Sequence, residues 1–204
     1  MHWIWSLVSL LTANTVRTRM PRRAPVLYLS FDDGPHPEHT PALLALLQRH
    51  GARATFFLIG TQAQAHPELV ERILAAGHGI GNHSMTHPRM PALSAREQWR
   101  EIRRADAVLA RFNGRARQMF RPPNGRATLA TILNSVVCRQ PLVLWSVDSL
   151  DYSRGAPEVT QRLEQMTLRG GDILLFHDDG GTACGALELL LPRWRAEGLR
   201  FEAL

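Results

Sequence analysis

The stretch VLYLSFDDGPHP, residues 26–37, places Asp32 and Asp33 side by side at the end of a short apolar run. An apolar run bounded by Asp, Gly and Pro predicts a buried strand that ends in a turn. A polar turn accounts for this pattern without any chemistry. A pair of carboxylates at a strand end is equally typical of a catalytic or metal-binding site, so the rest of the chain has to decide between the two interpretations.

Similar strand-like segments recur along the chain and alternate with helical segments. Strands are expected at 26–31, 54–59, 78–81, 118–121, 142–147, 172–176 and 200–203. Helices are expected at 40–51, 67–77, 94–113, 127–136, 157–170 and 185–198. This alternation predicts an α/β domain with parallel strands, and about seven such units suit a barrel-like arrangement. In a barrel of this kind, the chemistry belongs at the C-terminal ends of the strands.

The composition is ordinary for one soluble globular domain: 204 residues, of which 45% are hydrophobic and 21% charged. The formal charge is +6, and all 24 basic residues are arginine. The absence of lysine indicates an arginine-favouring genome more than a phosphate-binding surface. Because no zinc-finger spacing or aromatic-rich platform accompanies the charge, we expect no nucleic-acid partner.

The densest group of arginines lies in the predicted helix 94–113. At helical spacing these arginines lie opposite an apolar stripe. The two sets are Arg96, Arg100, Arg103 and Arg104, and Trp99, Ile102, Ala105, Leu109 and Phe112. We therefore expect a solvated arginine face and a buried stripe that includes Trp99.

Residues 1–22 form an N-terminal extension whose role the sequence does not assign. Its apolar part, MHWIWSLVSLLT, is too short to span a bilayer and lacks the basic start and cleavage pattern of a secretory signal. An interfacial membrane anchor, a degenerate signal and a helix packed on the domain all stay open, and Met20 is an alternative start. The compartment is undetermined, with a cytoplasmic or membrane-peripheral location favoured over secretion.

Cys138 and Cys184 are the only cysteines, and they lie far apart without a CxxC spacing. Two such residues are more often buried and reduced than paired, although the sequence leaves their pairing open. The oligomeric state is equally undetermined.

Polar residues with catalytic potential follow the predicted strands directly. They are Asp32, Asp33, His83, His87, Arg121, Asp148, Asp151 and His177. Polar residues placed only for solubility would not all fall at this edge. Their positions favour a functional site over a simple turn for the aspartate pair.

His83 and His87 lie four residues apart in NHSMTHP, a spacing that brings two imidazoles to one side of a helical turn, as in other zinc sites. A catalytic zinc site needs a third ligand and an open position for water, and a carboxylate suits the ligand role. Neighbouring strand residues point to opposite faces, so Asp32 and Asp33 both reach one site only if the strand ends there. The following Gly-Pro pair provides that end. One carboxylate can then bind the metal while the other accepts a proton from water.

Five short motifs, taken in order, resemble those of the polysaccharide deacetylase (NodB-homology) family of carbohydrate esterases. SFDDG (30–34) is similar to T-F-D-D-G, and HSMTH (83–87) matches H-S/T-x-x-H. RPPNG (121–125) is similar to R-x-P-Y-G, DSLDY (148–152) to D-x-x-D-W, and LFH (175–177) to L-x-H. The resemblance implies a distorted (β/α) barrel with fewer strands than the usual eight, and makes residues 23–204 the catalytic domain.

The resemblance implies one divalent metal ion bound by Asp33, His83 and His87. Zinc is the expected metal, with cobalt, manganese and nickel as alternatives.

The resemblance also implies the proton-transfer groups. Asp32 would be the catalytic base and His177 the general acid. Arg121 would orient the base, and Asp151 would pair with that arginine or tune its neighbourhood.

Three further residues would form the substrate pocket by the same resemblance. Leu175 would help to wall the space for the acetyl methyl group. Asn124 replaces the family tyrosine, whose main role is a backbone N–H in the oxyanion hole, and Tyr152 replaces the family tryptophan. These two departures affect the expected substrate and leave the reaction class unchanged.

The implied activity is metal-dependent removal of N-acetyl groups from amino sugars in an oligosaccharide, glycan or lipid-linked sugar. O-deacetylation or deformylation of a modified sugar by the same groups is an alternative. A non-catalytic carbohydrate-binding relative is another, although such a relative would usually have lost one of the five motifs.

Overall fold

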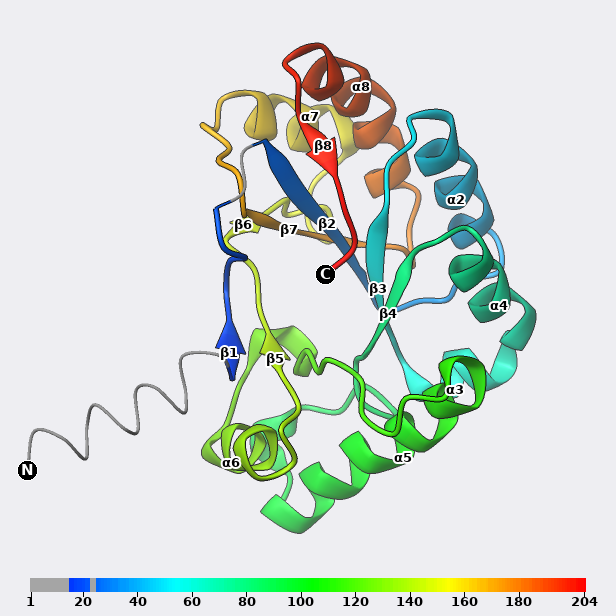
Figure 1. Ribbon diagram of the computed structural model, residues 1–204, viewed down its shortest axis with the longest axis vertical. Coiled ribbons are helices and arrows are strands. Elements are labelled where there is room, and N and C mark those ends of the chain that lie inside the picture. Colours follow the sequence, from blue (N-terminus) through cyan, green and yellow to red (C-terminus); the bar gives the residue numbers. More distant parts are fainter. Residues whose placement is uncertain (1–14, 23–24) are drawn as a thin grey trace, which may run out of the picture.

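The computed structural model describes residues 15–22 and 25–204, which form an α/β domain around parallel strands (Figure 1). The strands are β1 (Val16–Arg17), β2 (Val26–Asp32), β3 (Ala54–Leu58), β4 (Gly79–Asn82), β5 (Leu142–Val143), β6 (Val147–Asp148), β7 (Ile173–His177) and β8 (Arg200–Phe201). The main sheet runs in the order β4-β3-β2-β7-β6, and β8 also pairs with β2. Every one of these ladders is parallel, as the alternation of strands and helices predicts.

Helices surround the strands on the outside of the domain (Figure 1). They are α2 (His39–Arg49), α3 (Gly60–Ala65), α4 (Pro67–Ala75), α5 (Ala95–Asn113), α6 (Leu129–Val137), α7 (Ala156–Glu164) and α8 (Thr182–Ala196), with two short 3-10 helices, η1 (Met90–Ala92) and η2 (Pro123–Gly125). Local signals set the ends of α5: Ser94 and Glu97 form a capping box, and Gly114 ends the helix with a φ of 70°. The sequence analysis missed α3.

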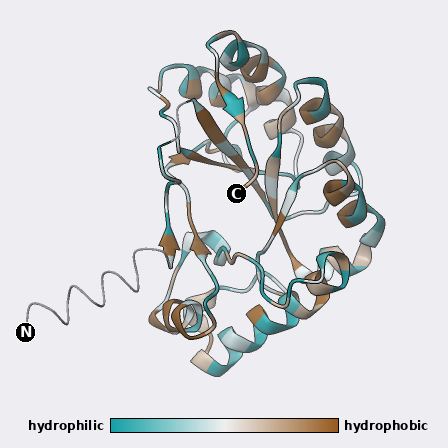
Figure 2. Cartoon of the chain, in the orientation of Figure 1, coloured by the Kyte–Doolittle hydropathy of each residue, from teal (hydrophilic) through white to brown (hydrophobic). Residues whose placement is uncertain are grey.

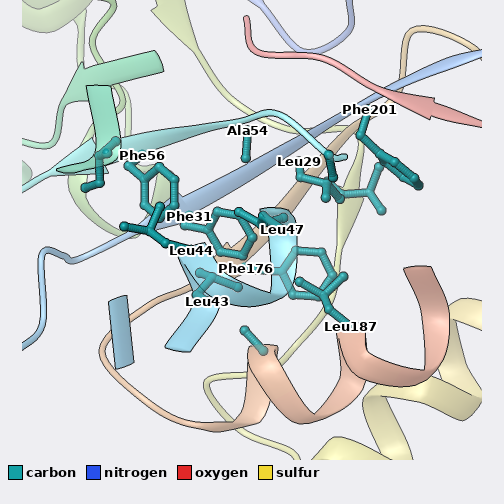
Figure 3. Close-up of a cluster of buried hydrophobic side chains, with 14 of the residues drawn as sticks. Leu29, Phe31, Leu43, Leu44, Leu47, Ala54, Phe56, Phe176, Leu187 and Phe201 are labelled. Carbon is teal, nitrogen blue, oxygen red and sulfur yellow. The ribbon is translucent and has the colours of Figure 1, made fainter. Parts of the chain in front are cut away.

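The core lies between the central strands and the helices that cover them. Leu29, Phe31, Phe56 and Phe176 project from β2, β3 and β7 against Leu187 of α8 (Figure 3). The rings of Phe31 and Phe56 stack with centroids 5.1 Å apart. Figure 2 shows the same division, with hydrophobic colour concentrated on the central strands and on the inner sides of the helices. This core fixes the strand ends that carry the site.

Two of the expected strands differ from the structure. Residues 118–121 contribute only Phe120, which bridges Asn82 on one side and Leu142 on the other. The expected strand 142–147 is divided into β5 and β6 because its partner changes: the Leu144 N–H donates to Arg17 of β1, whereas the Ser146 N–H donates to Ile173 of β7. Short strands joined by a single-residue bridge produce the distorted barrel that the resemblance implies.

The described part of the N-terminal extension, residues 15–22, is attached to the strands of the domain. β1 pairs with β5, and Arg19 makes an ion pair with Asp172 at 3.0 Å. The expectations for the apolar stretch at residues 1–14 lie outside the described residues. None of the helices that the structure describes has the length and apolar character to cross a membrane.

Two side-chain expectations have clear outcomes. Trp99 is 37% exposed, so its expected burial is wrong, whereas Ile102, Ala105 and Leu109 of the same stripe are fully buried. The indole of Trp99 lies over α6 and donates a hydrogen bond to the Ala130 carbonyl at 3.0 Å. Cys138 and Cys184 are both free thiols, which settles their pairing.

Candidate active site

The loops at the C-terminal ends of the strands line a cavity of about 510 Å³. Its walls contain Asp32, Asp33, His83, His87, Asn124, Gly125, Trp145, Asp148, Asp151, Tyr152, Leu175, His177, Asp179 and Gly180. The structure therefore brings together every residue that the sequence analysis proposed for the site except Arg121, which lies directly behind Asp32. The parallel register of β2 and β7 places Asp32 opposite His177 and so sets the centre of the site.

The backbone after β2 explains how two neighbouring aspartates face one cavity. Asp32 is the last residue of the strand, and Asp33 takes a left-handed conformation with a φ of 76°. Aspartate tolerates this region better than most residues. The strand alternation is thereby broken, and both carboxylates reach the site as the sequence analysis expected.

Gly34 makes this turn sterically feasible. A Cβ atom at this position would lie 2.1 Å from a carboxylate oxygen of Asp178. Asp178 is buried beneath the turn, where its N–H donates to the Asp32 carbonyl and its Oδ2 accepts from the Thr40 hydroxyl at 2.7 Å. Burial raises the pKa of Asp178 to about 7, and the nearby aspartates add to this shift against the opposing hydrogen bond from Thr40.

Asp33, His83 and His87 present their ligand atoms to one another. Asp33 Oδ1 lies 3.4 Å from His83 Nε2 and 3.2 Å from His87 Nε2. One ligand atom from each of the three residues lies within 4.8 Å of the others. Asp33 Oδ1 is buried and has no hydrogen-bond partner among the described residues. A cation is the partner that such a buried anionic oxygen lacks.

The surrounding hydrogen bonds prepare both imidazoles to bind a cation. His83 Nδ1 lies 2.8 Å from the Arg121 carbonyl oxygen, which can only accept, so Nδ1 carries the proton and Nε2 offers its lone pair. Burial lowers the pKa of His87, which favours the neutral ligand form although Asp33 opposes the shift. Two imidazoles and one carboxylate are a donor set typical of a catalytic divalent metal, so the residues fit the ion.

A buried network holds the loop that carries the two histidines. Asn82 Nδ2 donates to Asp106 Oδ1 on α5, and Asn82 Oδ1 accepts from the Ser84 N–H, at 2.8 and 2.7 Å. The Ser84 hydroxyl in turn accepts the His87 N–H at 3.0 Å. Hydrogen bonds of the Asn82 and Ser84 side chains therefore hold this loop independently of any cation.

Arg121 is fully buried and pairs with Asp32. Its Nη1 lies 2.7 Å from Asp32 Oδ1, and the same nitrogen donates to the Ser30 hydroxyl at 2.9 Å. Other guanidinium nitrogens donate to the carbonyls of Val143, at the end of β5, and of Leu144, which follows it. The guanidinium thus orients Asp32 as expected, and it also ties β2 to the segment between β5 and β6.

Asp151 pairs with His177, and its expected pairing with Arg121 is wrong. Asp151 Oδ1 lies 2.8 Å from His177 Nδ1, and Oδ2 accepts the His177 N–H at 2.7 Å. Burial alone would lower the pKa of His177, but the hydrogen bond and charge of Asp151, with smaller effects from Asp32 and Asp33, raise it to about 9. The contact with Asp151 therefore favours the protonated form of His177 at neutral pH.

The three expected pocket residues occupy different depths. Leu175 is 2% exposed and forms the floor on β7. Tyr152 is 61% exposed at the rim, with its ring edge-on to His177 at a centroid distance of 5.4 Å. Asn124 lies in η2 with a φ of 55°, another left-handed position that asparagine accommodates.

Sequence reasoning missed three supporting residues. Trp145 lines the cavity with its ring 5.6 Å from the Arg121 guanidinium, Ser30 bonds that guanidinium, and Asp178 supports the turn after β2. Ser30 is the first residue of the SFDDG motif and Asp178 directly follows LFH, which is a weak signal of a supporting role. No motif in the sequence marks Trp145 as a site residue, because its place in the cavity depends on the bend before β6.

Comparisons with known proteins agree with this geometry. The family model described as polysaccharide deacetylase matches residues 19–137. A peptidoglycan-N-acetylglucosamine deacetylase from Bacillus cereus is 34% identical over 180 residues, covering 86% of this chain and 66% of the relative. A chitooligosaccharide deacetylase from Sinorhizobium fredii is 36% identical over 156 residues, covering 76% and 73% of the two chains.

A solved structure gives the same result for the fold. The crystal structure of the Bc1960 peptidoglycan N-acetylglucosamine deacetylase superimposes with a TM-score of 0.88 at 30% identity, covering 98% of this chain and 95% of that one. Motifs, fold and matched length agree: this chain belongs to the polysaccharide deacetylase family.

Proposed function

We propose that this protein is a metal-dependent hydrolase that removes N-acetyl groups from amino sugars in glycans. The observation that carries the proposal is the convergence of three groups on one cavity: a candidate metal site, a carboxylate held by a buried arginine, and a histidine held by a buried aspartate. Amide hydrolysis needs a polarised carbonyl, a base for the attacking water and an acid for the leaving amine. Each group supplies one of these functions.

Asp33, His83 and His87 would hold the metal, and zinc is the ion we propose. A bound divalent cation supplies Lewis acidity, which makes water more acidic and a carbonyl more electrophilic. The neutral imidazoles and the ionised carboxylate are the forms that binding requires. Although burial opposes it, the neighbouring His83 and His87 hold the pKa of Asp33 below its usual value, which supports this ligand role.

Asp32 would accept the proton of the attacking water. Its Oδ1 is occupied by Arg121, which leaves Oδ2 directed toward the metal-binding residues, 3.7 Å from His83 Nε2. A carboxylate held by a guanidinium cannot rotate away from the site. Asp32 is therefore fixed in the orientation that proton transfer needs.

His177 would protonate the leaving amine. Its Nδ1 is engaged by Asp151, so Nε2 is the nitrogen that remains for the substrate. An amine leaves poorly without a proton, and the raised pKa of His177 keeps that proton available at neutral pH.

The remaining pocket residues would bind the acyl group and the sugar. The backbone N–H of Asn124 would stabilise the developing oxyanion, an effect of roughly 3–4 kcal/mol for one good donor. Leu175 would contact the acetyl methyl group. Tyr152, exposed at the rim, would contact the sugar.

The proposed substrates are N-acetylglucosamine units of peptidoglycan or of chitooligosaccharides, because the two named relatives act on these glycans. The cavity, of about 510 Å³, is lined by the residues proposed to bind the acyl group and the sugar.

The test is acetate release from chitooligosaccharides, peptidoglycan fragments and acetylated xylan, using zinc-loaded protein. We expect release from one or both N-acetylated substrates, and none from the same substrates with the Asp32→Asn variant as a matched control. Release from xylan alone would identify an O-deacetylase. No release from any substrate by metal-loaded, folded protein would support a non-catalytic carbohydrate-binding relative instead.

A further inference from the structure

Helix α6 carries a row of apolar side chains that the described part of the protein leaves exposed. Leu129, Leu133 and Val137 follow one another at a spacing of four residues and are 72%, 48% and 70% exposed. The helix, LATILNSVV, contains no charged residue, and Figure 2 shows it in hydrophobic colour. A helix with such a composition normally covers its apolar side, and a contiguous exposed row marks a binding surface. We call these three residues the apolar row.

Helix α5 borders the apolar row with aromatic and basic side chains. Trp99, half-exposed, connects the two helices through its hydrogen bond to the Ala130 carbonyl. A shallow surface depression of about 460 Å³ surrounds it, and its lining consists of Arg96, Trp99, Arg100, Arg103, Arg104 and Ala107. No acidic residue contributes to this lining.

Two acids of α5 offset part of this charge, but they are outnumbered by the four arginines of the lining. Glu97 is engaged by Ser94 in the capping box, and Glu101 accepts bonds from the N–H and hydroxyl of Thr86. Exposed Arg126 and Arg139 flank the two ends of α6. The face is therefore apolar in one strip and positively charged beside it.

We propose that the apolar row and the α5 arginines form a face that binds an anionic lipid surface. Apolar side chains that enter the lipid headgroup region, a tryptophan at the boundary and arginines that meet lipid phosphates are the components of interfacial binding.

The position of the first described residues also supports the binding of a lipid surface by this face. Val16 of β1 and Ile132 of α6 pack against one buried cluster, so the described chain begins near helix α6. The sequence before it, MHWIWSLVSLLT, is apolar. Only residues 126–128 separate the apolar row from Gly125 at the cavity, so a bound lipid surface would lie close to the pocket rim.

The test measures partition of the full chain onto vesicles of phosphatidylcholine alone and of phosphatidylcholine with phosphatidylglycerol. Two variants address the face: Leu129→Gln/Leu133→Gln/Val137→Gln and Arg100→Gln/Arg103→Gln. Their matched controls are Leu189→Gln, which replaces a leucine of α8 that is 61% exposed, and Arg72→Gln/Arg154→Gln, which replaces two exposed arginines on other elements.

We expect wild-type protein to prefer the anionic vesicles. The triple variant should lose about tenfold or more in partition onto them. The arginine variant should lose about fivefold for each charge removed, with the loss shrinking at high salt. Both controls should partition like wild type, and acetate release from a soluble chitooligosaccharide should be the same in all proteins that fold.

Three outcomes would overturn the proposal. The first is wild-type protein that binds neither vesicle. The second is a triple variant that partitions like wild type, which would assign binding to residues 1–14 or another segment. The third combines two results: the triple variant melts several degrees lower than wild type, and wild type does not bind vesicles. The apolar row would then be covered by residues 1–14 or by a second copy of the chain. None of these readouts depends on the proposed activity.

Discussion

Asp151 holds His177 by two hydrogen bonds, from the backbone N–H at 2.7 Å and from ring Nδ1 at 2.8 Å. One carboxylate thus fixes both the backbone and the ring of the proposed acid. The same contact raises the pKa of His177 to about 9 against the effect of burial. The two residues lie 26 positions apart, yet they act as one unit.

Replacing Asp151 with asparagine should weaken the acid and shift its titration. His177 must be protonated to act, so activity falls as pH rises through its pKa, and loss of the Asp151 charge lowers that pKa. We expect a loss of about 10² in kcat/KM and an alkaline limb at lower pH than in wild type. The measurement is a pH profile of kcat/KM. An unchanged alkaline limb would contradict the pairing.

Replacing Asp32 with asparagine should abolish most turnover and leave the metal in place. The change removes a proton acceptor but none of the three metal-binding side chains. Elemental analysis and acetate release on the same samples check both halves of the prediction. Loss of metal together with activity would mean that Asp32 is a ligand.

His83→Ala should remove the metal, because it deletes one of three ligand atoms that face one another. We expect less than a tenth of the wild-type metal content, since second-shell changes alone typically cost 10–100-fold in affinity. His66→Ala, on the other side of α3, is the control and should keep full occupancy. Equal metal content in the two variants would reject the site.

Asp178→Asn should change how stability depends on pH. The folded pKa of Asp178, about 7, lies above the ordinary value of 3.8. The stability contributed by this carboxyl is therefore fully present below about pH 4 and is lost as pH rises through 7. Relative to wild type, the variant should gain up to about 4 kcal/mol in unfolding free energy between pH 4 and pH 8.

Urea unfolding of both proteins in a chelator measures this difference without the pH dependence of metal binding. The exposed Glu71→Gln variant is the control and should follow the wild-type curve. A constant difference between Asp178→Asn and wild type across this range would show that the carboxyl is ionised throughout.

Tyr152→Trp should alter specificity and leave metal content unchanged. The ring lies at the rim against His177, where a larger aromatic side chain changes contacts with the sugar or acyl group. We expect the ratio of acetyl to formyl cleavage, or of short to long oligosaccharides, to shift by a few fold. Asn124→Ala is the comparison, because a backbone donor survives that change. If Tyr152→Trp left both ratios unchanged and Asn124→Ala abolished turnover, the roles assigned to the two residues would be reversed.

The sequence predicted the site better than it predicted the elements around it. Asp32, Asp33, His83, His87 and His177 follow strands whose apolar runs are unambiguous, so parallel strand ends bring them together. The partner of Asp151 could not be predicted, because the motifs carry no information on which loop faces which. That choice depends on the pairing of β6 with β7, in which the Ser149 N–H donates to the Leu175 carbonyl and brings the following residues to His177.

The two errors in the helices have similar causes. The α3 segment lacks an apolar period, and its first N–H groups, of Gly60 and Thr61, bond to the carbonyls of Ser84 and Met85 in the metal-binding loop. Tertiary contacts therefore create that helix. Trp99 belongs to a regular apolar stripe, but α6 covers only one edge of its ring.

The pairing of β1 with β5 has a consequence for where the chain can be shortened. Leu142 and Leu144 donate their N–H groups to the carbonyls of Thr15 and Arg17, both at 2.7 Å. A chain that starts at Met20 lacks these acceptors and turns an internal ladder into an open sheet edge. Open edges with apolar side chains recruit strands from other molecules. Self-association, and not loss of catalysis, is thus the defect we expect from such a start.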